Sequence, residues 1–289
     1  MMFTIHSDHM SAVIDSAGAQ LMSLQSSDGT QYLWQGDPNY WPDRSLTIFP
    51  YVARLTDGCY RYRGQVYHMP IHGFAPTAEF SVTEQMDGCV TFSLESSPAF
   101  YAQYPFLFCY SIRYRLEETT LRVEITVKNK DEKTMYFGLG GHPGINVPLE
   151  EGLGFEDYVL QFPPCQPRRV EFTPACFITG RELPFPMECN QLPLSHHMFD
   201  EDAIVLKGIP GEVTLKSSKG HRGVTLMAPD FPIFGFWHMP KTDAPYICLE
   251  PWSSLPSHQD VIEDLEKQVD LISLPAMGVY QTAWSLQCF

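Results

Sequence analysis

The segment YSIRYRLEETTLRVEITVKNK (residues 110–130) contains two runs in which apolar and polar side chains alternate, residues 110–116 and 121–130. Such alternation puts every second side chain on one face of an extended chain, and it is typical of a β-strand with one face in a core. The same pattern recurs in FSLES (92–96) and EVTLKSS (212–218). The sequence therefore predicts a protein built mainly of β-strands.

Turn-forming residues separate these runs. The chain has 20 glycines and 24 prolines, in motifs such as SSDGT (26–30) and KGIPG (207–211). Many short strands between turns indicate an antiparallel sandwich or barrel, and 289 residues exceed an immunoglobulin-like unit of about 100 residues. No composition shift or fixed-period repeat divides the chain. We expect a single all-β domain over residues 1–289, a large antiparallel β-sandwich with few short helices.

Two segments show helical features. DVIEDLEKQVDLI (260–272) has aliphatic residues at spacings of three and four and acidic residues at its start, which suit the helix dipole. This pattern predicts a helix, with a short loop helix as the alternative. SPAFYAQYPF (97–106) is interrupted by Pro105 and predicts one helical turn at most.

The composition argues against several classes of partner. With 19 Lys and Arg against 34 Asp and Glu, the formal net charge is −15. Nucleic-acid binding depends on clustered cations, so no nucleic-acid partner is expected, and anionic membranes and highly phosphorylated substrates are disfavoured for the same reason. A neutral sugar meets no such repulsion.

The cysteines and the first residues of the chain bear on the cellular compartment in which the protein works. The eight cysteines include no CxxC pair, and a chain of this length needs no disulfides, so we expect reduced and mostly buried thiols. Residues 1–18 lack a basic region followed by an apolar one, and no stretch approaches about 18 uninterrupted apolar residues. We expect a cytoplasmic protein with no membrane partner.

Polar residues interrupt otherwise apolar sequence in two segments. FPYVARLTDGCYRYRGQVYHMPIHGFA (49–75) holds Arg54 and His72, which by themselves also suit a structural ion pair and a turn histidine. FGLGGHPGINVPL (137–149) holds His142 among glycines that allow close approach of the backbone to a bound molecule. A β-bulge with an incidental imidazole is the alternative for His142.

A third segment, FPIFGFWHMPKTDAPYICLEPW (231–252), places Glu250 at the end of the strand-like run YICLE. A carboxylate at the end of an apolar strand is costly unless it is paired or kept as a base with a raised pKa. Trp237 and Trp252 offer apolar faces on which a sugar ring stacks, although either residue also suits a core.

Four pieces of sequence carry a resemblance to a known family. They are the 49–75 segment, GGHPGINVPL (140–149), FDEDAIVLKGI (199–209) and CLEPW (248–252), in that order. With these pieces the chain resembles the aldose 1-epimerases, in particular the galactose-mutarotase-like branch that includes LacX-type sequences. The resemblance implies a β-supersandwich with its site on the concave face, and no cofactor and no metal.

The resemblance also implies roles for individual residues. His142, in the Gly-His-Pro segment, would be the general acid, and Glu250, before Pro-Trp, the general base. His72 and Arg54 would bind the oxygens of a small-molecule sugar. Asp202 matches the family's substrate-binding aspartate, and the two acidic residues directly before it are alternatives for that role.

Acid and base side chains suit the interconversion of sugar anomers. A base removes the proton of the C1 hydroxyl while an acid protonates the ring oxygen. The ring then opens to the aldehyde, which closes again to either anomer. We therefore expect an aldose 1-epimerase (mutarotase) acting on a free hexose. The chain departs from the family pattern at Pro76, Gly144 and Ser253, which we expect to affect the preferred sugar more than the chemistry.

Other functions stay open at the level of sequence. One is a non-catalytic carbohydrate-binding or regulatory protein on the same fold. Another is a hexose-phosphate mutarotase, for which Arg44, Arg61 and Arg63 lie near the first segment. A glycoside hydrolase would need two carboxylates, and a metalloenzyme built on the histidines and Glu250 lacks HxH or HExxH spacing.

Overall fold

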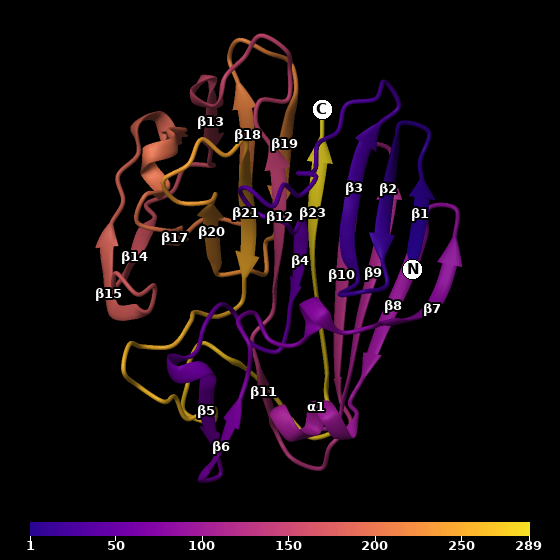
Figure 1. Ribbon diagram of the computed structural model, residues 1–289, viewed down its shortest axis with the longest axis vertical. Coiled ribbons are helices and arrows are strands. Elements are labelled where there is room, and N and C mark those ends of the chain that lie inside the picture. Colours follow the sequence, from indigo (N-terminus) through magenta and orange to yellow (C-terminus); the bar gives the residue numbers. More distant parts are fainter.

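The computed structural model describes residues 1–289 and confirms the all-β class and the large antiparallel sheets. The larger sheet has nine strands in the order β16 (Gln191–Pro193), β13 (Tyr158–Gln161), β18 (Glu212–Ser217), β19 (Gly223–Met227), β23 (Val279–Cys288), β10 (Thr120–Asn129), β9 (Phe108–Glu117), β8 (Cys89–Glu95) and β7 (Ser81–Met86). The second has seven, in the order β15 (Ile178–Pro184), β14 (Arg168–Phe172), β17 (Ile204–Lys207), β20 (Ile233–Trp237), β21 (Tyr246–Trp252), β12 (Gly140–Asn146) and β4 (Ser45–Ile48). Figure 1 shows most strands of both sheets running along the long axis of the molecule.

Three small sheets and a few short helices complete the structure. The small sheets are β1 (Met2–His6), β2 (Met10–Asp15) and β3 (Gln20–Ser26); β5 (Cys59–Tyr62) and β6 (Gln65–His68); and β11 (Met135–Phe137) and β22 (Ile272–Leu274). The α-helix is α1 (Pro98–Gln103), and the 3-10 helices cover Thr56–Gly58, Ala75–Thr77, Phe155–Asp157, Glu188–Asn190 and His196–Phe199. No helix has the length and hydropathy needed to span a bilayer. That residues 1–289 form one domain stays a prediction.

The strands predicted from alternation are confirmed. Residues 110–116 lie in β9, and residues 121–130 lie in β10 apart from Lys130, which follows the strand. The two strands pair antiparallel, with Leu121 opposite Leu116 and Ile125 opposite Ile112. All four of these side chains are buried, because each strand presents every second residue to the core.

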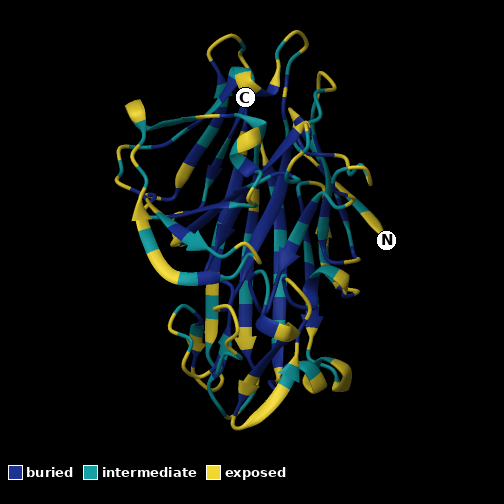
Figure 2. Cartoon of the chain, turned by 60° about the vertical axis from the view of Figure 1, so that its left-hand side comes forward, coloured by how far each residue is buried: buried dark blue, intermediate teal, exposed yellow.

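Aromatic residues fill much of the core of 64 buried residues. The ring of Phe49, which follows β4, stacks on Tyr110 of β9 at a centroid distance of 4.2 Å. Phe162 meets Phe236 of β20 edge to face at 5.8 Å. Each such pair adds about 0.5–1.5 kcal/mol beyond the burial of its area. Figure 2 shows the buried residues along the middle of the strands and the exposed residues mainly in loops.

Strand β21 is buried on both faces. Ile247 and Leu249 belong to the main core, while Cys248 and Trp252 belong to two smaller apolar clusters on the opposite face. Successive side chains of a strand point to opposite faces, so Glu250 lies on the same face as Cys248 and Trp252. The structure thereby places Glu250 on the face of the seven-stranded sheet that points away from the main core.

The predicted helix over residues 260–272 is wrong. This segment forms turns, because its backbone groups pair with strand β5: Arg61 N donates to Glu263 O over 2.7 Å, and Leu265 N donates to Arg61 O over 2.8 Å. Val269, which the helical spacing assigned to an apolar face, is 93% exposed. The spacing of apolar residues therefore did not reflect a packed helix face.

Helix α1 is longer than the single turn expected, at six residues. The hydroxyl oxygen of Ser97 accepts a hydrogen bond from Phe100 N over 3.3 Å and caps its first turn. The helix ends before Pro105, as the sequence indicated. All eight cysteines are free; four are buried, three half-buried, and Cys189 is exposed, so burial is less complete than expected.

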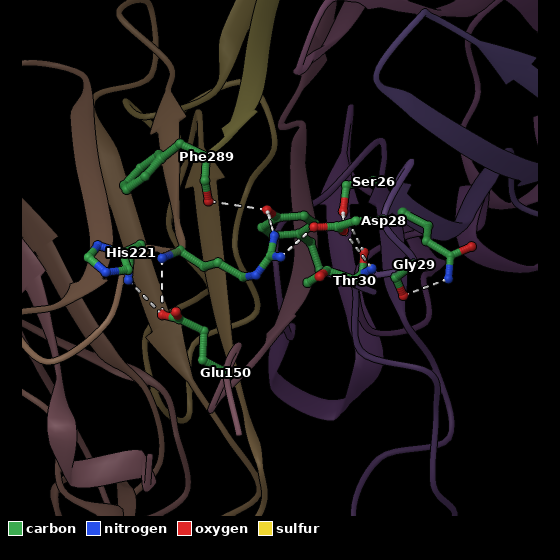
Figure 3. A network of polar contacts seen from close by, with 10 residues as sticks. Ser26, Asp28, Gly29, Thr30, Glu150, His221 and Phe289 are labelled. Carbon is green, nitrogen blue, oxygen red and sulfur yellow. Dashed lines mark hydrogen bonds and ion pairs between the residues drawn. The ribbon is translucent and has the colours of Figure 1, made fainter. Parts of the chain in front are cut away.

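A polar network ties the first and last parts of the chain together (Figure 3). Arg222 forms an ion pair with Asp28, and its guanidinium also donates to Tyr32 OH over 3.3 Å. The Tyr32 hydroxyl donates to Phe289 O over 3.1 Å. Glu150 accepts hydrogen bonds from the backbone of the turn that carries Arg222. The segment that follows β3 is thereby joined to the turn before β19 and to the last residue of the chain.

Candidate functional site

His142 and Glu250 lie side by side on neighbouring strands. In the pairing of β12 with β21, Gly140 is opposite Trp252 and Gly144 is opposite Cys248. His142 and Glu250 each lie midway between these pairs, so the register brings them together. His142 Nε2 is 3.2 Å from Glu250 Oε2. The two residues that the sequence proposed as acid and base are therefore within reach of one proton transfer.

The imidazole of His142 is enclosed by other rings. The ring centroids of Trp41, His72 and Trp237 lie 4.8, 5.4 and 5.8 Å from its own. Burial, and to a lesser extent the neighbouring His72, lowers the pKa of His142 well below the usual value. Its Nδ1 is buried without a hydrogen-bond partner. The ring therefore presents Nε2 to Glu250 as a neutral base or, once protonated, as an acid.

Glu250 is only 1% exposed. Burial raises the pKa of its carboxyl well above the usual value; a hydrogen bond from Trp252 opposes this rise, and the charge of Asp202 adds to it. Trp252 Nε1 donates to Oε2 over 3.1 Å. The raised pKa agrees with the sequence argument that a carboxyl group at this place must be paired or kept as a working base.

His72 lies in a left-handed turn beside His142, with φ 62°. Its Nδ1 accepts a hydrogen bond from Ala53 N over 3.3 Å, so in the neutral ring the proton is on Nε2. Burial and the neighbouring Arg54 lower the pKa of His72 to about 4. His72 is therefore a neutral hydrogen-bond donor at physiological pH. Gly73 allows the tight turn, because a side chain there would collide with Phe49 O.

Arg54 and Asp202 complete the set that the sequence proposed. Arg54 Nη1 donates to Ala175 O over 3.3 Å, which holds the guanidinium at the rim. Asp202 has φ 87°, and its Oδ1 accepts from Ala203 N over 2.9 Å. Both residues line the same cavity as His72, His142 and Glu250, so the structure brings all five predicted residues together.

This cavity has a volume of about 290 Å³. Ligand cavities range from about 300 to 1,000 Å³, so the space suits one small molecule such as a single sugar ring. Its apolar walls include Trp41, Phe172, Trp237 and Trp252. A wider groove of about 800 Å³ adjoins it and shares six lining residues with it: Arg54, Phe172, Cys176, Asp202, Ala203 and Trp237.

Several lining residues were missed by the sequence argument. Trp41, Asp43, Phe172 and Cys176 all line the cavity, yet they lie outside the segments that carry the resemblance. Burial raises the pKa of Asp43. No local pattern distinguishes these residues from ordinary loop or core positions: Trp41, Asp43 and Cys176 lie outside the large sheets, and Phe172 is the last residue of β14.

The three departures from the family pattern do not line the cavity. Pro76 packs its carbonyl against Gly18, and Ser253 Oγ accepts a hydrogen bond from Leu139 N over 2.8 Å. Gly144 lies behind the cavity wall, where a Cβ atom would be 3.1 Å from the ring of Trp41. These three residues therefore have no direct contact with the space inside the cavity. Neither the cavity nor the groove is lined by Arg44, Arg61 or Arg63, the cations considered for a phosphate group.

The chain is similar to known proteins over most of its length. The family model described as aldose 1-epimerase matches residues 1–261. Protein LacX (plasmid) of Lactococcus lactis subsp. lactis is 31% identical in an alignment of 290 positions that covers 95% of this chain and 96% of that protein. A galactose mutarotase-like protein from Lactobacillus casei ATCC 334 is 31% identical over all of both chains, with a TM-score of 0.95. The galactose mutarotase related enzyme from Lactobacillus acidophilus is 30% identical over 100% of this chain and 97% of that chain, also with a TM-score of 0.95.

Proposed function

The chain belongs to the aldose 1-epimerase family, and from this premise we propose that it is an isomerase that interconverts the α and β anomers of a free hexose. The observation that carries the proposal is the buried pair of His142 Nε2 and Glu250 Oε2, 3.2 Å apart at the wall of a cavity of about 290 Å³. An acid and a base at this separation suit two proton transfers on one sugar ring.

Ring opening moves one proton off the sugar and one proton onto it. Glu250 takes the proton of the C1 hydroxyl, the C1–O5 bond breaks as the C1 carbonyl forms, and His142 gives a proton to O5. The C1–C2 bond of the open aldehyde then rotates. In the closing step O5 attacks the other face of C1, His142 takes back its proton, and Glu250 returns its proton to O1.

The pair carries one exchangeable proton through this cycle. The opposite pKa shifts of the two groups favour a neutral carboxyl beside a neutral imidazole in the empty cavity. A sugar hydroxyl that donates to Glu250 stabilises the carboxylate and so favours the imidazolium of His142, the form that donates to O5. Because two interacting groups share the proton, the pH dependence of the reaction belongs to the pair.

The remaining predicted residues would hold the sugar while C1 stays free to rotate. His72 donates through Nε2–H, Arg54 donates from the rim, and Asp202 accepts from hydroxyl groups. Hydrogen bonds of this kind contribute about 0.5–1.5 kcal/mol each, or somewhat more where a charged group takes part. Apolar faces of the sugar suit the rings of Trp41 and Trp237.

The charge of the adjoining groove favours a neutral sugar over a phosphorylated one. Its two cations beyond the cavity, Arg169 and Lys241, share the groove with Glu171, Asp200 and Glu201. A phosphate group would gain from the cations but would also meet the carboxylates. We therefore propose a free hexose as the substrate.

The test follows the optical rotation of freshly dissolved α-glucose and α-galactose with wild type, His142→Ala and Glu250→Gln. The Gln side chain keeps the shape of Glu250 and an oxygen that accepts from Trp252, so it removes the base with little change in packing. We expect wild type to speed anomerisation and both variants to lose about 10²- to 10⁴-fold of that rate. Circular dichroism checks that the variants are folded. Wild-type rates equal to those of buffer, or variants as active as wild type, would contradict the proposal.

A further inference from the structure

A third side chain joins His142 and Glu250 in a compact cluster. Cys248 precedes Glu250 by two residues on β21 and lies on the same face of the strand. The nitrogen of His142, the sulfur of Cys248 and a carboxylate oxygen of Glu250 all lie within 4.8 Å of one another. All three residues are buried, at 7%, 0% and 1% exposure. The acid–base mechanism uses the first and the last of them but gives the thiol no role.

The spacing suits a tetrahedral metal ion. Zinc binds nitrogen at about 2.0–2.1 Å, carboxylate oxygen at about 2.0–2.2 Å and sulfur at about 2.3 Å, which separates the ligand atoms by roughly 3.3–3.6 Å. His142 Nε2 and Glu250 Oε2 are already 3.2 Å apart. Small rotations of the side chains would bring the sulfur to the same separation, and the cavity that His142 and Glu250 line leaves the fourth position open.

We propose that His142, Cys248 and Glu250 form an inhibitory binding site for a thiophilic divalent cation, for which Zn²⁺ is the best match. One imidazole, one thiolate and one carboxylate form a mixed set that selects Zn²⁺ over Mg²⁺ or Ca²⁺, which prefer oxygen ligands alone. The thiol has no competing partner in the structure, since Cys248 takes part in no side-chain hydrogen bond and packs beside Trp34, Trp41 and Tyr246.

Charge balance favours the complex in this buried place. When Zn²⁺ binds, a Zn–S bond replaces the S–H bond and the thiol proton passes to the buffer, as does any proton held by Glu250. One thiolate and one carboxylate then neutralise the two positive charges of the ion. A neutral cluster avoids the cost of an unpaired charge in an apolar interior.

The inhibitory part of this inference rests on the proposed function. The metal would occupy the lone pair of His142 Nε2 and the carboxylate oxygen that the proton transfers require, so a sugar cannot react while the ion is bound. Metal binding itself depends only on the three side chains, and it is measured without any sugar.

The experiment titrates metal-free full-length protein, prepared by dialysis against a chelator, with Co²⁺ as a coloured substitute for Zn²⁺. We expect one Co²⁺ per chain, a thiolate-to-cobalt charge-transfer band and visible bands of tetrahedral cobalt, all abolished by added Zn²⁺. Cys248→Ser and Cys248→Ala should lose the thiolate band and at least about tenfold in affinity. Cys189→Ser, which removes an exposed thiol, is the matched control and should bind as wild type does.

A second measurement follows anomerisation of α-glucose during a Zn²⁺ titration, relative to each variant's own metal-free rate. We expect Zn²⁺ to inhibit wild type and Cys189→Ser reversibly, and to inhibit the Cys248 variants at least about tenfold more weakly. Absence of a thiolate band, or equal Co²⁺ affinity in the Cys248 variants, would overturn the metal site. Full activity with the metal bound would overturn its inhibitory role. A metal-free protein without activity would count against the proposed function alone, because the cobalt titration decides the metal site.

Discussion

Trp252 Nε1 donates its hydrogen bond to Glu250 Oε2, the same oxygen atom that lies 3.2 Å from His142 Nε2. Glu250 and Trp252 are two residues apart on β21, so their side chains share one face of the strand. Gly235 of β20 is directly opposite Glu250, and a Cβ atom there would lie 3.2 Å from the ring of Trp252. Because Gly235 has no side chain, the indole of Trp252 fits against it. The hydrogen bond from the indole then orients the carboxyl group of Glu250.

Removing this indole donor should shift the pH dependence of activity upward. The hydrogen bond from Trp252 lowers the pKa of Glu250, so Trp252→Phe should raise it further. In the pair the lower pKa belongs to His142 and the higher one to Glu250, so the basic limb of kcat/KM moves to higher pH. The reactive carboxylate–imidazolium form becomes rarer, so kcat/KM at pH 7 falls about tenfold, or about 1.4 kcal/mol. Trp237→Phe is the control, because Trp237 lines the same cavity without bonding Glu250. An unchanged basic limb in Trp252→Phe would show that the indole does not tune the pKa of the carboxyl group.

A change at Asp202 should shift the same limb in the opposite direction. The charge of Asp202 raises the pKa of Glu250, so Asp202→Asn should lower it and move the basic limb of kcat/KM to lower pH. Asn tolerates the left-handed backbone at φ 87° and keeps an oxygen for Ala203 N. The loss of a charged acceptor should also raise KM. Profiles of Asp202→Asn and Trp252→Phe that move in the same direction would contradict this account of the electrostatics.

The sequence was a good guide where local pattern and long-range structure agree. The alternation in residues 110–130 predicted β9 and β10, because these strands bury every second side chain. It was a poor guide over residues 260–272, where the periodicity was helical but the backbone pairs with β5. Their partner Arg61 is about 200 residues away in the chain, so the spacing of apolar residues within 260–272 cannot indicate this pairing.

The sequence likewise predicted some residues of the candidate site and missed others. Arg54, His72 and Glu250 lie in segments that carry the family resemblance, and the structure brings them to one cavity. Trp41 and Cys176 reach that cavity from loops, and nothing in their neighbouring sequence indicates it. Cys248 lies two residues before Glu250 in the motif CLEPW, yet its relation to His142 follows only from the register of β12 and β21.

Buried histidines should make the fold sensitive to acid. His238 is 0% exposed, its Nδ1 is 2.8 Å from Met239 O, and its Nε2 is 3.3 Å from His196 Nδ1. Burial lowers the pKa of His238 from 6.5 to about 4. Between these values the unfolded chain binds a proton that the folded chain does not, so stability should fall as pH falls from 6.5 to 4.

The measurement is the free energy of unfolding in urea at several pH values between 4 and 7. Each histidine of this kind contributes a slope of up to about 1.4 kcal/mol per pH unit, and His72 is a second one. His238→Gln should therefore reduce the slope by up to that amount. His68→Gln, at an exposed position of β6, is the control and should leave the slope unchanged. Equal slopes in the two variants would rule out His238 as a source of acid sensitivity.

A methyl group at Gly141 should disturb the packing of the two large sheets. A Cβ atom at Gly141 of β12 would lie 2.7 Å from the ring of Trp284 of β23, and Trp284 is only 4% exposed. Because the indole has little space to move, Gly141→Ala should lower the free energy of unfolding by about 1–3 kcal/mol. It should also reduce activity, since any displacement of β12 moves the adjacent His142. Gly88→Ala is the matched control: a Cβ atom there lies 3.6 Å from its nearest neighbours, so the change should stay within about 0.5 kcal/mol. If the two variants have the same urea midpoint, β12 shifts at Gly141 without loss of stability. The close approach to Trp284 would then not constrain His142.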